Sequence, residues 1–90
     1  MVNLTYTVTK NVLGEIILTI TYCYGVLQKT IEYTYSRSTL LNLLKHTDKE
    51  YFLYQQFKYI VDKIPYSECK DLFMIKRQQI KNEILILLNL

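Results

Sequence analysis

Histidine, cysteine and acidic residues are the side chains from which this chain could build a catalytic or metal site. His46 is the single histidine, and Asp48 and Glu50 follow it in the spacing His-x-Asp-x-Glu. On a helix, residues two positions apart point in different directions, so these three side chains do not converge on one ion. We therefore predict neither a metal site nor an acid–base pair in this segment.

Nucleophilic catalysis requires an activating base beside the nucleophile. Cys23 and Cys69 have no such base near them in the sequence, and no serine lies in a glycine-rich turn. The sequence is therefore interpreted as non-enzymatic and without a cofactor. Cys23 falls on the outer face of a predicted sheet and Cys69 on the inner side of a predicted helix. We expect no bridge within the chain, and a bridge from Cys23 to a second copy is the alternative.

Basic residues cluster in the last third of the chain, at Lys70, Lys76, Arg77 and Lys81. No acidic residue lies between Leu72 and Asn82, so these cations could follow the phosphates of a nucleic acid. The net charge is only +3, and nearby acidic side chains compensate much of the local field. A nucleic-acid-binding module is therefore the alternative function rather than the preferred one.

The first 36 residues repeat an alternation of apolar and polar positions that predicts strands. Gly14 and Gly25 mark two tight turns, and both turns select the same apolar face. The register predicted from them pairs Leu4 with Tyr22, Ile20 with Ile31, and Leu18 with Tyr33. Because the tyrosines fall on the inner face, the sheet is not predicted to stack bases.

From residue 38 onward the apolar period becomes helical. The predicted helices cover about 38–46, 48–64 and 67–89, with Ser38, Thr47 and Ser67 as N-caps and Thr47 and Glu50 forming a capping box. The expected fold is α+β, a three-stranded antiparallel meander over about 2–36 with three helices on one face. Ninety residues predict a single domain, 1–90.

Composition sets the chain apart more than any motif does. It contains nine tyrosines, no tryptophan, two glycines and one proline, and half of its residues are apolar. In its richness in Tyr, Ile and Lys it resembles the small orphan proteins of crenarchaeal (Sulfolobus-type) viruses. The resemblance covers composition only and implies an intracellular modulator of the host, including an inhibitor of CRISPR defence, that is often a dimer. It implies a host cytoplasmic location, and the N-terminal residues lack the pattern of a signal peptide.

Apolar surface exceeds what a small core can absorb, which favours self-association. The preferred function is therefore a non-enzymatic binding protein, expected to be a homodimer with a host protein as its partner and no membrane contact. The candidate contact residues lie on two helices, at Phe52, Tyr59, Leu85, Ile86 and Leu88. Two dimer modes are left open: pairing through the C-terminal helix, or pairing through the edge strands of the sheet.

Overall fold

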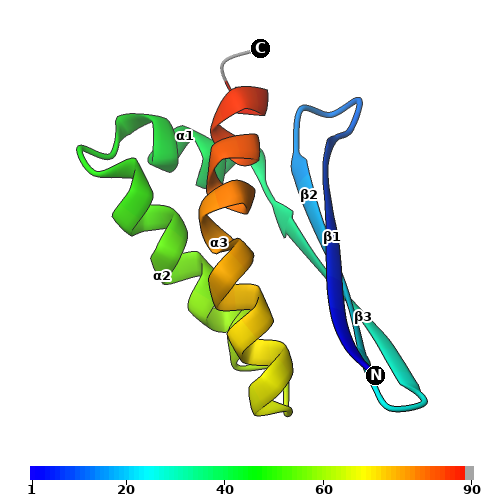
Figure 1. Ribbon diagram of the computed structural model, residues 1–90. Helices are drawn as coiled ribbons and strands as arrows, with labels where there is room; N and C mark the ends of the chain where they lie inside the picture. Colours follow the sequence, from blue (N-terminus) through cyan, green and yellow to red (C-terminus); the bar gives the residue numbers. More distant parts are fainter. Residues whose placement is uncertain (89–90) are drawn as a thin grey trace.

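Two hairpins build the sheet in the computed structural model, which describes residues 1–88. Its strands are β1 (Val2–Lys10), β2 (Ile16–Tyr24) and β3 (Leu27–Tyr35). They form one antiparallel sheet in the order β1-β2-β3, so that β2 is central and β1 and β3 are edges (Figure 1). The predicted three-stranded meander is confirmed.

The turns account for the register. Gly14 and Gly25 both have positive φ, at 82° and 63°, a conformation that glycine adopts without strain. The Asn11 side chain closes the first turn by accepting from the amides of Leu13 and Glu15. The predicted pairs Leu4 with Tyr22, Ile20 with Ile31, and Leu18 with Tyr33 are all present.

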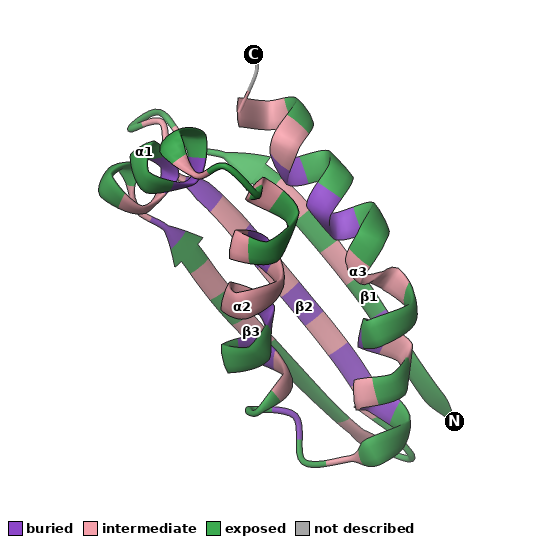
Figure 2. Cartoon of the chain, turned by 90° about the vertical axis from the view of Figure 1, so that its left-hand side faces the viewer, coloured by how far each residue is buried: buried purple, intermediate pink, exposed green. Residues whose placement is uncertain are grey.

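Three helices follow the sheet: α1 (Arg37–Lys45), α2 (Lys49–Val61) and α3 (Ser67–Leu88). Helices α2 and α3 lie over one face of the sheet, with α3 along β1 and α2 beside β3 (Figure 2). The core forms between these two layers. It contains the alternate residues Leu4, Leu18 and Ile20 of the sheet and Leu53, Phe57, Phe73, Ile80 and Ile84 of the helices.

The three predicted helices are confirmed, and each begins within one residue of its predicted start, but the predicted N-caps are wrong. Ser36 rather than Ser38 caps α1, and its hydroxyl accepts from the Thr39 amide. Ser36 directly follows the last residue of β3, so it is the first side chain able to cap. Asp48 rather than Thr47 caps α2 by accepting from the Tyr51 amide.

The predicted capping box does not form, because the Glu50 side chain binds Lys81 of α3 instead. Helix α2 ends at Val61, three residues before the predicted end, although Ile64 is still fully buried. Helix α3 begins at Ser67 itself, so this residue lies inside the helix rather than capping it. Residue 89 of the predicted last helix lies outside the described residues.

Within residues 1–88, no helix combines the length and apolar character needed to cross a membrane.

Candidate interaction surface

The two edges of the sheet differ in what covers them. In an antiparallel ladder, alternate residues direct both backbone groups toward the neighbouring strand and the others direct them away. The Asn11 amide bonds the Glu15 carbonyl and the Gly25 amide bonds the Met1 carbonyl, so the odd residues of β1 face β2. The even residues of β1, including Leu4 and Tyr6, therefore direct their backbone groups to the free edge.

The β1 edge is guarded by α3. The Lys76 ammonium donates to the outward carbonyl oxygen of Leu4 at 2.6 Å. Further along the same edge, partial burial and then the Glu83 carboxylate raise the pKa of Tyr6 to about 12. Covering an edge strand with a helix is a common way of preventing another strand from pairing there. The β1 edge is thus a poor site for an additional strand.

The β3 edge has no such cover. Its outward residues are the even positions, since the odd positions of β3 pair with the even residues of β2. These outward residues are all exposed: Gln28, Thr30, Glu32 and Thr34. Within residues 1–88, no protein group hydrogen-bonds their backbone amides or carbonyls. The strand is nine residues long and contains no proline.

Helix α2 adds an aromatic flank to this edge. The Tyr33 hydroxyl of β3 donates to Gln56 Oε1 of α2 at 2.6 Å, which fixes one side of α2 beside β3. On the same side, Tyr59 is 62% exposed and Phe52 is half-buried. Burial and then the neighbouring Tyr59 raise the pKa of Tyr33. We call the set Gln28, Thr30, Glu32, Thr34, Tyr33 and Tyr59 the β3 edge surface.

The C-terminal contact residues are placed differently from Tyr59. Leu85 and Leu88 are half-buried and pack against the core, and Ile84 between the two layers is fully buried. Ile86 alone of the three predicted contact residues is well exposed, at 59%. The apolar end of α3 is therefore largely absorbed by the chain's own core, and less of it is free for a partner than the sequence suggested.

The four basic residues of α3 do not form one open stripe. Lys81 is buried with its ammonium 2.8 Å from Glu50, and Lys76 is bound to the edge of β1. The Arg77 guanidinium lies 4.5 Å from the centre of the Tyr54 ring, and Lys70 is half-buried. Hydrogen bonding to Glu50 is the main reason why the pKa of Lys81 is raised. Three of the four cations are thus engaged within the fold.

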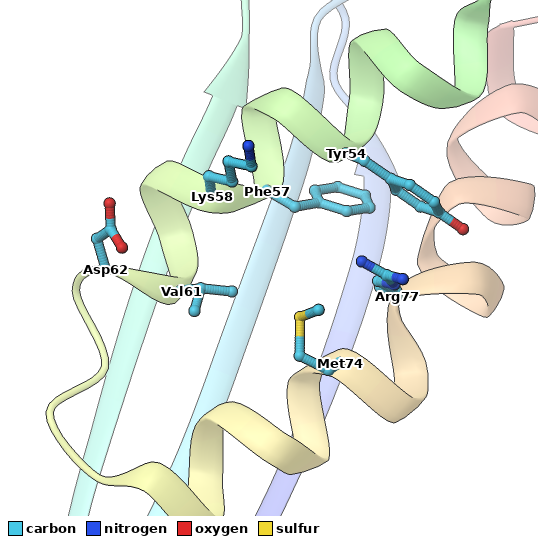
Figure 3. A pocket seen from close by; sticks show the side chains of 7 residues that line it. All are labelled: Tyr54, Phe57, Lys58, Val61, Asp62, Met74 and Arg77. Atoms are coloured by element: carbon cyan, nitrogen blue, oxygen red, sulfur yellow. The ribbon is translucent and has the colours of Figure 1, made fainter.

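A pocket of about 190 Å³ opens between α2 and α3 (Figure 3). Phe57, Val61 and Met74 give it an apolar lining, and Arg77 stacks on Tyr54 at one end. A second pocket of similar volume lies between the first hairpin, α1 and the end of α3. The linings of the two pockets contain neither cysteine nor His46.

Three of the residues first considered for chemistry, His46, Asp48 and Cys69, make contacts within the fold. His46 Nδ1 accepts from the Asp48 amide beside the start of α2. Within the described part of the chain, no three metal-binding side chains gather. Both cysteines are free thiols. The Cys69 thiol contacts the Cys23 carbonyl at 3.7 Å, a proximity that the sequence did not predict, and burial is the main cause of its raised pKa.

Comparison of the chain with family models, curated proteins and solved structures gave no match. The described residues form a small α+β protein. One edge of its sheet, β1, is covered by α3, and the other edge, β3, is free.

Proposed function

We propose that the chain is a non-enzymatic binding protein that associates with itself and acts through protein–protein contact. The observation that carries the proposal is the β3 edge surface. It combines a nine-residue strand with a row of free backbone groups and an exposed aromatic side chain above it. Adding a strand to such an edge is a recurring mode of protein recognition, in which backbone hydrogen bonds supply affinity.

The chemistry of this surface fits a protein partner better than a nucleic acid. Its exposed side chains are threonines, Gln28, Glu32 and a tyrosine, and the carboxylate would repel phosphates. A strand from another protein, by contrast, needs only the unpaired amides and carbonyls and a flank on which to rest. The compositional resemblance described above extends the proposal to an intracellular viral modulator that occludes a host protein.

Nucleic-acid binding by Lys70, Lys76, Arg77 and Lys81 gains no support from their placement. A phosphate would have to displace Glu50 from Lys81 or the Leu4 carbonyl from Lys76. An electrophoretic retardation assay at low and moderate salt tests this alternative. A shift that disappears when these residues are replaced would favour nucleic acid over the proposed function.

Self-association is tested by sedimentation equilibrium of the full chain across the micromolar range. The proposal predicts a monomer–dimer equilibrium whose dimer fraction rises with concentration. A single monomeric species at every concentration would contradict the self-association part of the proposal.

A further inference from the structure

We infer that the occupant of the β3 edge is β3 of a second copy, paired antiparallel about a twofold axis at Ile31. The two three-stranded sheets would then become one continuous sheet. The inference rests on the proposed function, because it specifies how the chain associates with itself. It selects the edge-strand mode over pairing through the C-terminal helix.

Hydrogen-bond geometry limits the possible registers. The outward groups of one β3 must meet the outward groups of the other, so even residues pair with even residues. Ile31 is the middle residue of Leu27–Tyr35, and a twofold axis there pairs all nine residues of each strand. Thr30 then faces Glu32 of the second copy, and Gln28 faces Thr34. Symmetric registers centred elsewhere on the strand leave residues at its ends unpaired.

Avoidance of like-charge repulsion favours the same register. Centring the pair on Glu32 would place two carboxylates directly opposite each other, an arrangement that destabilises a sheet. Centring it on Ile31 instead sets Glu32 opposite the neutral Thr30. On the inner face, the exposed Lys29 lies opposite Tyr33 of the second copy, where a cation can rest on an aromatic ring. Ile31 meets its own copy at the axis, which adds an apolar contact.

The aromatic flank of α2 enlarges the contact. Each copy carries α2 beside β3 on the same face of the sheet, so the two α2 flanks approach each other across the axis (Figure 2). Tyr59 is 62% exposed in the single chain and would be covered there. A standard interface buries roughly 1,200–2,000 Å² of total surface, and a strand edge alone offers little of it. The flank of α2 therefore supplies the apolar area of the proposed interface.

The substitution Thr30→Pro tests the edge directly. The Thr30 amide points outward, and proline is tolerated on an edge strand where the lost N–H faces solvent. The single chain should therefore still fold, whereas pairing of the two strands loses a hydrogen bond in each copy. We expect the dimer dissociation constant to rise by at least about tenfold. Thr30→Val is the matched control, since it also lacks the hydroxyl that contacts Thr21 but keeps the amide.

Cysteine cross-linking tests the register and does not depend on how Thr30→Pro folds. In a Cys23→Ser background, Ile31→Cys places two thiols at a non-hydrogen-bonded pair, where the strands come closest. Treatment with diamide should link this variant into a covalent dimer. Thr34→Cys in the same background is the control, because its opposite residue is Gln28, and it should link at least about tenfold more slowly.

The outcomes separate the two proposals. Rapid linking at residue 31 but not at residue 34, with a weakened Thr30→Pro dimer, supports the inference. A wild-type dimer that Thr30→Pro leaves unchanged, with equal linking at both positions, overturns the β3 register and leaves the proposed function standing. A wild-type chain that is monomeric throughout the micromolar range overturns the inference together with the self-association part of the proposed function.

Discussion

The ammonium group of Lys76 lies 2.6 Å from the carbonyl oxygen of Leu4, so the middle of α3 is tied to the outer edge of β1. This contact makes the two edges of the sheet unequal. It covers an edge group that would otherwise accept from another strand, while the outward groups of β3 stay open. In the proposed pairing through β3, one edge of each chain is used and the other is covered, so the assembly would close as a dimer.

Replacing Lys76 should open the second edge. Lys76→Met removes the ammonium from the Leu4 carbonyl while keeping an extended side chain, at a cost of about 1 kcal/mol in stability. With both edges free, we expect species larger than a dimer in sedimentation velocity runs at high concentration. Lys70→Met on the same helix is the control. Identical size distributions for the two variants would show that Lys76 does not guard the edge.

The ion pair between Lys81 and Glu50 should stabilise the packing of α3 on α2. The Lys81 side chain is only 11% exposed, so Glu50→Gln leaves a charge without its counterion in a poorly hydrated place. Because the Glu50 side chain is 55% exposed, we expect a loss of only about 1–2 kcal/mol. Urea denaturation of the variant and the wild type measures this loss in the free energy of unfolding. Adding Lys81→Met to Glu50→Gln should recover much of the loss, and strictly additive effects would contradict the coupling.

Tyr35→Phe should stabilise the chain. Among the described residues, the Tyr35 hydroxyl is the buried side-chain group without a hydrogen-bond partner. It loses its hydration on folding and gains no hydrogen bond in return, so removing it should lower the free energy of the folded state. We expect a gain of up to about 1 kcal/mol in the free energy of unfolding. Tyr33→Phe, which removes the hydrogen bond to Gln56, should instead lose about 1 kcal/mol. A loss at Tyr35 equal to that at Tyr33 would mean that the Tyr35 hydroxyl has a partner.

Stability should decline in alkaline solution. Burial raises the pKa of Tyr22, Tyr33 and Tyr35 above the ordinary value near 10, and burial together with Glu83 raises that of Tyr6 to about 12. Above pH 10 the unfolded chain releases protons that the folded chain retains, so the free energy of unfolding falls with rising pH. Lys81, whose pKa is also raised, acts in the same direction.

Circular dichroism and tyrosinate absorbance, recorded together from pH 8 to 12, measure this effect. Ionisation of the buried tyrosines should coincide with unfolding, and Tyr35→Phe should make the decline less steep. Full ionisation of all nine tyrosines in a chain that keeps its folded spectrum would contradict the prediction.

The sheet was predictable because its determinants are local. Gly14 and Gly25 fix two turns, and each turn sets the pairing of the residues that flank it. The apolar stripes of α2 and α3 were predictable for a similar reason, since a helix repeats its inner face at fixed intervals. The placement of Tyr59 on an exposed flank follows from that same period.

The roles of the charged residues were not predictable, because their partners are distant in the sequence. Lys76 bonds a strand residue seventy-two positions away, and Lys81 takes Glu50 out of its expected capping box across thirty-one positions. Both contacts depend on how α3 packs against β1 and α2, which no local pattern encodes. Because the contact of Lys76 could not be predicted, the sequence indicated that both sheet edges are free. In the structure, α3 covers the β1 edge and only the β3 edge stays uncovered.

Hydrogen exchange at the outward amides of β3 tests the central claim most directly. Thr30 and Glu32 have no intramolecular acceptor for their amides within the described residues. If β3 pairs with a second copy, their protection should rise with protein concentration in the micromolar range, while that of the outward Val8 amide on β1 stays constant. Exchange at Thr30 and Glu32 that is fast and independent of concentration, in a chain that sediments as a dimer, would contradict the claim.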